Sequence, residues 1–192
     1  MVLRVDSGVE RRVREGALGC SNCRDNFPIH EGFVDLRAPP RGERGRGLAG
    51  EPGAVDEEAE EAERVVALLG IPRGPGVVTV VGGPARHAAA VAARVDDLMV
   101  VAIDPDLVRW DEAPGVSRMI AAPGLPFFSR MLRGAVVDGR LGGAWIEEAA
   151  RVVAPMSRVV VQDAPVEASR TLAEAGLRVL AEEAETVVAA RS

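Results

Sequence analysis

The sequence contains no lysine and no tyrosine, so all 23 of its basic residues are arginine. Its two cysteines are too few for a disulfide framework. No apolar run approaches the roughly 18 residues that a membrane-spanning helix needs, and residues 1–8 lack the apolar core of a signal peptide. We therefore expect a soluble cytoplasmic protein that does not act in a membrane.

The 192 residues, 47% of them hydrophobic, suffice for one ordinary domain, or for a domain with a small appendage. The net charge of −6 is concentrated in residues 51–192, where 14 arginines face 22 acidic residues. Residues 1–50 carry nine arginines and seven acidic residues. This acidity argues against direct binding of nucleic-acid backbones as the main function, so the expected partner is a small molecule or a protein.

The most informative stretch runs from residue 76 to residue 104. It predicts, in order, a buried strand, a glycine turn, a helix, a second buried strand and an acid: Val77–Val81, Gly82-Gly83-Pro84, residues 86–95, Leu98–Ile103 and Asp104. This order is typical of a nucleotide-binding βαβ unit, in which the acid binds the ribose hydroxyls. Asp104 lies about 21 residues past Gly83, near the expected offset of about 20, although G-x-G-x-x-G itself is absent. Two simpler explanations stay open, a plain turn at Gly82-Gly83 and a helix cap at Asp104.

The N-terminal residues carry two further patterns. Apolar residues on both sides of Asp6-Ser7-Gly8 predict a hairpin with its turn there. Cys20 and Cys23 form a C-x-x-C pair, which is half of a tetrahedral zinc site. A redox role is disfavoured, because residues 27–36 look extended rather than helical. The pair could be a metal-free remnant, or two chains could share one zinc ion, which would make the protein a homodimer.

The first 37 residues resemble a known family. Gly16–Cys20, then Phe27-Pro28-Ile29 and Gly32-Phe33-Val34, are similar to the second half of the small zinc-ribbon proteins that activate tRNA, rRNA and release-factor methyltransferases. The family's first cysteine pair has no counterpart after Met1. The resemblance implies a partial zinc-ribbon-like β domain at residues 1–37.

The remaining segments alternate between strand and helix patterns. Residues 38–55, rich in glycine, arginine and proline, are expected to be a linker or mobile loop. The further strands are predicted at 117–121, 135–137, 158–162, 177–182 and 186–191, and the further helices at 56–69, 106–112, 141–154 and 167–175. This order predicts an α/β fold with a mostly parallel sheet and one antiparallel edge.

A second resemblance covers residues 60–192. Leu125-Pro126-Phe127, the strand Ala135-Val136-Val137 and the helix from Ile146 to Pro155 are similar in order and spacing to class I S-adenosylmethionine-dependent methyltransferases. The resemblance implies a Rossmann-like domain at residues 56–192, with seven strands of which the last is antiparallel. It also implies S-adenosylmethionine as the cofactor.

The cofactor motif of that family is degenerate in this chain. Thr79 stands where the family has an acid, and Val81, Gly83 and Ala85 stand where it has three glycines. Ala121 or Ala122 replaces the acid that usually lies near the adenine. The residues that the resemblance places at the cofactor are Thr79, Val81, Gly82, Gly83, Asp104, Pro105, Leu125 and Asp138. Asp138 could equally belong to an ordinary Asp-Gly turn.

No catalytic acid–base pair can be assigned from the sequence. Two functions therefore stay open. The chain could be a methyltransferase-like protein that binds S-adenosylmethionine and methylates a small molecule. It could instead be an inactive pseudo-methyltransferase that serves as a scaffold or partner-binding module.

Overall fold

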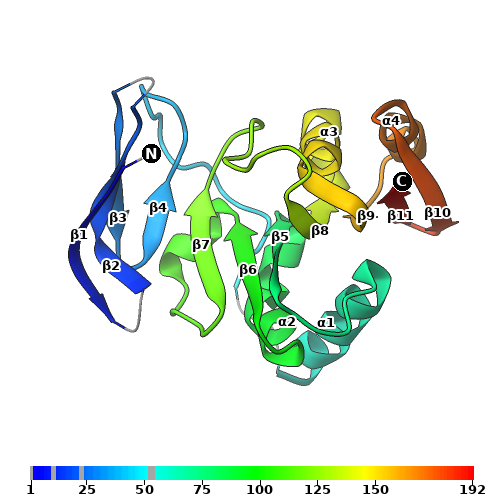
Figure 1. Ribbon diagram of the computed structural model, residues 1–192, viewed down its shortest axis with the longest axis horizontal. Helices are drawn as coiled ribbons and strands as arrows, with labels where there is room; N and C mark the ends of the chain where they lie inside the picture. The colour runs from blue at the N-terminus through cyan, green and yellow to red at the C-terminus, as the bar shows by residue number, and fades with distance from the viewer. Residues whose placement is uncertain (1, 10–11, 22–23, 52–54) are drawn as a thin grey trace.

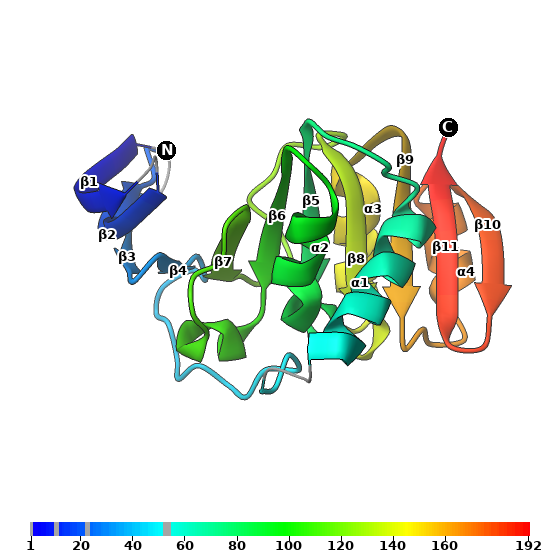
Figure 2. The same cartoon turned by 90° about the horizontal axis from the view of Figure 1, so that it is seen from below.

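A computed structural model describes residues 2–9, 12–21, 24–51 and 55–192. They form one eleven-stranded sheet with helices packed on both faces (Figure 1; Figure 2). The strands are β1 Val2–Val9, β2 Arg12–Gly19, β3 Asn26–His30, β4 Phe33–Asp35, β5 Gly76–Val81, β6 Leu98–Ile103, β7 Val116–Ile120, β8 Leu132–Asp138, β9 Val153–Gln162, β10 Leu177–Glu183 and β11 Thr186–Arg191. The helices are α1 Val55–Leu69, α2 Ala88–Arg94, α3 Gly143–Val152 and α4 Ala168–Glu174, with 3₁₀ turns η1 Gly83–His87, η2 Pro105–Arg109 and η3 Gly139–Leu141.

The strands lie in the order β1-β2-β3-β4-β7-β6-β5-β8-β9-β11-β10. From β7 to β9 the neighbouring strands are parallel, and β11 is antiparallel to both β9 and β10. The predicted α/β Rossmann-like fold, with mostly parallel central strands, is confirmed, and β9, β11 and β10 form its antiparallel edge. β1 to β4 are antiparallel to one another and add a second antiparallel edge. Because β6 and β8 flank β5 on opposite sides, the chain changes direction across the sheet at β5. Ligands of open α/β sheets bind at such a switch point, beyond the carboxyl ends of the strands.

Two apolar cores lie on the two faces of the sheet. Alternate residues of a strand point to opposite faces, so Val80 of β5 packs with α1 and α2, whereas Val81 packs with α3 and α4. Figure 2 shows α1 and α2 in front of the sheet and α3 and α4 behind it. Burial on both faces explains the uninterrupted apolar runs of the central strands.

Residues 56–192 supply seven of the eleven strands, β5 to β11, and residues 1–37 extend the same sheet with β1 to β4. β4 pairs in parallel with β7, which places Val34 opposite Met119. The buried guanidinium of Arg118 in β7 donates hydrogen bonds to the carbonyl oxygens of Glu31, Leu107 and Trp110. The N-terminal strands are therefore joined to the α/β part by backbone pairing and by a buried side chain.

Local predictions differ from the structure in several places. The predicted helix at 106–112 is the 3₁₀ turn η2, and the predicted helix at 141–154 ends at Val152, where β9 begins five residues before its predicted start. β1 continues through Asp6-Ser7-Gly8, with its register to β2 shifted there, so the predicted turn at these residues is wrong. The predicted helix at residues 86–95 is preceded by the 3₁₀ turn η1, which begins at Gly83, and α2 begins only at Ala88. Pro84 suits the first turn of η1, because proline is tolerated at a helix start.

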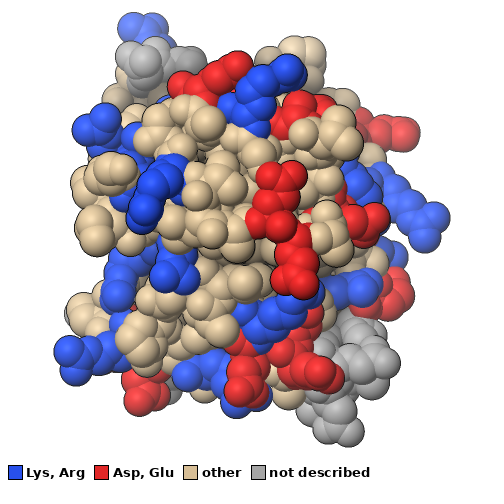
Figure 3. Space-filling model, turned by 90° about the vertical axis from the view of Figure 1, so that its right-hand side faces the viewer, with Lys and Arg blue, Asp and Glu red and all other residues tan. Residues whose placement is uncertain are grey.

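The surface and the helices give two further observations. The end of the molecule formed by β10, β11 and α4 carries arginine and acidic side chains interspersed, with no large patch of one sign on that face (Figure 3).

Among the described residues, the helices are all too short or too polar to cross a bilayer.

Candidate functional site

A cavity of about 250 Å³ lies where the carboxyl ends of β5, β6 and β7 meet. Its walls are mainly apolar, with two arginines and one acid among them. The lining residues are Arg37, Gly45, Arg46, Gly47, Leu48, Val81, Gly82, Ile103, Asp104, Pro105, Ile120, Ala121, Leu141 and Trp145. A concave, largely apolar site with a few polar groups at a topological switch point is the usual form of a small-molecule site in this kind of sheet.

The turn after β5 forms one side of the cavity and requires glycine. Gly82 has a φ of 77°, and a Cβ placed there would lie 2.7 Å from Cβ of Asp138. The backbone N–H of Gly83 donates to Oδ2 of Asp138 at 3.1 Å. The turn therefore passes close over the end of β8.

Asp104 lies next to this turn, directly after the end of β6. Its Oδ1 accepts the backbone N–H of Asp106 at 2.9 Å, so Asp104 caps the η2 turn. Asp104 and Asp106 are 3% and 6% exposed, and a buried carboxylate must be satisfied by hydrogen bonds. The remaining donors come from a distant part of the chain.

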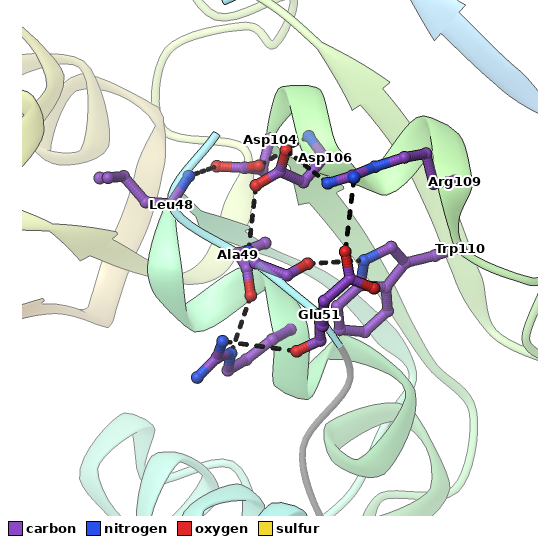
Figure 4. Close-up of polar contacts among 9 residues, drawn as sticks. Leu48, Ala49, Glu51, Asp104, Asp106, Arg109 and Trp110 are labelled. Atoms are coloured by element: carbon purple, nitrogen blue, oxygen red, sulfur yellow. Dashed lines mark hydrogen bonds and ion pairs between the residues drawn. The ribbon is translucent and has the colours of Figure 1, made fainter. Parts of the chain in front are cut away.

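Residues 45–51, which we call the strap, supply those donors (Figure 4). The N–H of Leu48 donates to Oδ2 of Asp104 at 2.8 Å, and the N–H of Gly50 donates to Oδ2 of Asp106 at 3.1 Å. The strap belongs to the segment predicted as a linker. Residues 38–51 of that segment form no helix or strand, yet the strap is fixed against η2.

No family model matches the chain, and no curated protein matches it in sequence. Solved structures do match. One belongs to the complex of the Haloferax volcanii Trm112 methyltransferase activator with a chain described as a methyltransferase, at 13% identity and a TM-score of 0.51, covering 67% of this chain and 72% of that one. A Methanococcus maripaludis protein described as an S-adenosylmethionine-dependent methyltransferase matches at 11% identity and a TM-score of 0.52, covering 71% and 86%.

The fold is that of the class I methyltransferases. Identities this low establish the methyltransferase fold alone. The [4+2]-cyclase SpnF matches equally well, at 14% identity and a TM-score of 0.52, covering 74% of this chain and 66% of that one. Since one match is named for a cyclisation, the methyltransferase fold does not by itself define the reaction.

The residues predicted to contact a cofactor divide into two groups in this methyltransferase fold. Val81, Gly82, Asp104 and Pro105 line the cavity. The others lie outside its lining: Thr79, Gly83, Leu125 and Asp138.

Each residue outside the lining has a structural contact of its own. Thr79 is buried within β5, and its hydroxyl donates to the carbonyl oxygen of Val101 at 3.0 Å. Asp138 is fully buried and accepts hydrogen bonds from Gly83 and from the backbone and guanidinium of Arg140. This contact raises the pKa of Arg140.

Leu125 is held by a pair of charged residues on α3. Its N–H donates to Oε2 of Glu148 at 2.6 Å, and its carbonyl oxygen accepts from Arg151 at 3.0 Å. Hydrogen bonds from Arg151 and Leu125 outweigh burial and hold the pKa of Glu148 below its ordinary value. Glu148 and Arg151, three residues apart on α3, therefore fix the loop at Leu125-Pro126-Phe127, a role that the sequence did not indicate.

Sequence reasoning missed several lining residues. Leu141 lies just before α3, and Trp145 lies in the first turn of α3. The sequence indicated them only by their position after β8, the fourth strand of the α/β part. Arg37 is fixed by hydrogen bonds to Asp35 at 3.0 and 2.8 Å. Burial raises the pKa of Asp35, but these bonds outweigh burial and keep that pKa below its ordinary value. Nothing in the sequence indicates that Arg37 lines the cavity or that Asp35 holds it there.

The predicted half zinc site is only partly within the described residues. Cys20 directly follows β2 and is partly buried, whereas Cys23 lies outside the described residues. Within the described part of the chain, no group of three or more His, Cys, Asp or Glu side chains could hold a metal ion. The zinc site stays a prediction.

Proposed function

We propose that this chain binds S-adenosylmethionine, or its product S-adenosylhomocysteine, in the cavity beyond β5, β6 and β7. The observation that carries the proposal is that Gly82 and Asp104 both line one cavity, directly after the neighbouring strands β5 and β6, at the switch point of a class I methyltransferase fold. Gly82 lets the backbone approach a ligand closely, and the carboxylate of Asp104 is the kind of group that binds a ribose diol.

The rest of the lining supports a nucleoside ligand in part. Leu141 and Trp145 give an apolar wall on which a base or a thioether chain can pack. Ala121 lines the cavity where the family has an acid, so the adenine would gain no charged partner there. We therefore expect binding weaker than in a site with all of its polar contacts.

The N-terminal strands fit the same proposal as a built-in activator. β4 adds a strand in parallel to β7, at the edge of the sheet nearest the cavity. One matching structure is a complex between a methyltransferase activator and a chain described as a methyltransferase. We propose that residues 1–37 act on residues 56–192 within one chain as such an activator acts between two chains.

Methyl transfer to a small molecule is the reaction that follows from this site. Among the described residues that line the cavity, Asp104 is the only group that could act as a general base, and it is already hydrogen-bonded. Transfer would therefore rely on holding the donor and the acceptor in line, so the acceptor would need to be nucleophilic without losing a proton first.

A scaffold without cofactor binding is the second candidate. It is favoured by the internal satisfaction of both Asp104 and Asp138, which need no ligand for their hydrogen bonds. A scaffold predicts no affinity for the nucleotide, so one binding measurement separates the two candidates.

Isothermal titration with S-adenosylmethionine and S-adenosylhomocysteine tests the proposal. Binding should weaken at least about tenfold in Asp104→Asn, because the variant loses the charge that strengthens a hydrogen bond from a ribose hydroxyl. Asp97→Asn is the matched control, since Asp97 is exposed just before the opposite end of β6 and asparagine tolerates its φ of 59°. No heat from either nucleotide at millimolar concentration would refute the proposal and favour the scaffold.

A further inference from the structure

The strap lies in the position that a nucleoside would need. Four of its residues, from Gly45 to Leu48, line the cavity, and its Leu48 N–H occupies Oδ2 of Asp104. The other oxygen of Asp104 accepts from Asp106. Because Asp104 is only 3% exposed, a ribose hydroxyl could reach its carboxylate only if the strap moved away.

Gly47 brings the strap closer to the two carboxylates than any other residue type could. A Cβ on Gly47 would lie 1.8 Å from Oδ1 of Asp104 and 2.9 Å from Cγ of Asp106. Both distances are far shorter than a non-bonded contact allows, and both aspartates are buried and cannot simply rotate into solvent. The closed position of the strap therefore depends on glycine at residue 47.

Two side chains outside the cavity fasten the other end of the strap. Arg86 donates to the carbonyl oxygens of Ala49 at 2.9 Å and Glu51 at 3.4 Å, and the indole N–H of Trp110 donates to Gly50 at 3.1 Å. Ala49 itself is fully buried in the core. The strap is thus anchored at separate points along its length rather than by a single contact.

The volume left beside the strap is small. At about 250 Å³ the cavity is below the roughly 300–1,000 Å³ of ordinary ligand sites. Residues 45–48 of the strap form part of the cavity wall, so a movement of the strap away from Asp104 would both enlarge the cavity and expose the Asp104 carboxylate.

From these contacts we propose that the strap is an intramolecular competitor of the methyl donor, closed in the free protein and displaced when the donor binds. The proposal rests on the proposed function, because it assumes that a nucleoside uses Asp104. Only molecules with an open strap can bind the donor, so the apparent affinity is the intrinsic affinity multiplied by the fraction of molecules in which the strap is open. Weakening the strap should therefore tighten donor binding.

Gly47→Ala and Arg86→Ala weaken the strap from two sides. The first forces residue 47 away from Asp104, and the second removes the anchor at Ala49 and Glu51 without changing the cavity lining. Gly42→Ala is the matched control, because a Cβ at Gly42 meets nothing within 4 Å and Gly42 does not line the cavity. Circular dichroism establishes that each variant is folded.

Two measurements are made on each full-length variant. Limited digestion with trypsin, which cuts after Arg44 and Arg46, follows opening of the strap without any ligand. Titration with S-adenosylhomocysteine follows the affinity. We expect Gly47→Ala and Arg86→Ala to be cut at least about ten times faster and to bind about tenfold tighter, since each loses a contact to a charged group. Gly42→Ala should behave as the unchanged protein.

The other outcomes are distinguishable. Faster cleavage with unchanged or weaker binding would overturn the competitor while leaving the proposed function in place. Unchanged cleavage in both variants would show that these contacts do not hold the strap, which also overturns it. Faster cleavage with no binding in any variant would refute the proposed function itself.

Discussion

The N–H of Gly83 lies 3.1 Å from Oδ2 of Asp138, and this contact joins the turn after β5 to the end of β8. The carboxylate is fully buried, and its other partners are the backbone and guanidinium of Arg140. Asp138 therefore shapes the glycine turn from behind. A residue predicted to contact the cofactor in fact holds the backbone that borders the cavity.

Asp138→Asn should lower the free energy of unfolding by about 2–3 kcal/mol, because an amide nitrogen cannot accept a hydrogen bond and leaves a buried donor unsatisfied. Urea unfolding measures the loss. Asp163→Asn is the control: Asp163 lies 3.3 Å from the same guanidinium but is 42% exposed, and asparagine suits its φ of 48°. The control should change stability by less than about 0.5 kcal/mol. Equal losses in the two variants would contradict this account of Asp138.

The α/β part of the fold could be predicted from the sequence because its signals are local. Val77–Val81 and Leu98–Ile103 are apolar runs of strand length, and the glycine pair between strand and helix marks the turn. These features identify a buried parallel sheet without knowledge of distant contacts. The resemblance to methyltransferases added the strand order that the local patterns leave open.

The strap and the eleven-stranded sheet could not be predicted in this way. Leu48 and Asp104 are 56 residues apart, and a glycine- and arginine-rich segment has no periodicity that indicates what it binds. The pairing of β4 with β7 likewise depends on edge backbone groups, which every sequence carries. The bulge at Asp6-Ser7-Gly8 resembles a turn locally, and only pairing with β2 distinguishes the two.

Glu148→Gln tests the contact that holds the Leu-Pro-Phe loop. The pKa of Glu148 is lowered in the folded state, so its contribution to stability is complete above the unfolded pKa of about 4.3 and is lost as the pH falls through the folded value. At pH 7 the variant should be less stable by about 1–2 kcal/mol. The difference should shrink as the pH falls below the unfolded pKa of about 4.3, because the unfolded chain then takes up a proton before the folded glutamate does.

Unfolding curves at several pH values follow this difference, and Glu147→Gln provides the control. Glu147 lies next to Glu148 on α3 with its side chain exposed, so its substitution should change stability by less than about 0.5 kcal/mol. A Glu148→Gln deficit that stayed constant down to pH 3 would mean that the loop depends on shape rather than on the charge of Glu148.

Arg118→Met should separate the N-terminal strands from the rest of the sheet. Methionine fills similar space but leaves the carbonyl oxygens of Glu31, Leu107 and Trp110 without their charged donor. We expect a loss of about 2–4 kcal/mol in unfolding free energy. Hydrogen exchange at β4 should also become faster, since Glu31 lies in the turn that joins β3 to β4.

Arg178→Met on the exposed side of β10 is the control for this substitution, and it should leave both measurements nearly unchanged. If Arg118→Met destabilised the protein without faster exchange in β4, the important contacts of Arg118 would be those to Leu107 and Trp110 rather than the contact to Glu31. The N-terminal strands would then be joined to the sheet by backbone pairing only.

The two tryptophans of the chain report on different sides of the site. Trp145 lines the cavity, whereas Trp110 donates its indole N–H to Gly50 of the strap. In Trp145→Phe, S-adenosylhomocysteine should shift the emission of Trp110 to longer wavelength, because displacement of the strap exposes that indole to water. Gly47→Ala combined with Trp145→Phe should show the shift without ligand, and Gly42→Ala with Trp145→Phe should not. A response from Trp145 in Trp110→Phe, with none from Trp110 in Trp145→Phe, would mean that the ligand enters beside a closed strap, and the Leu48 N–H would then remain on Asp104 in the complex.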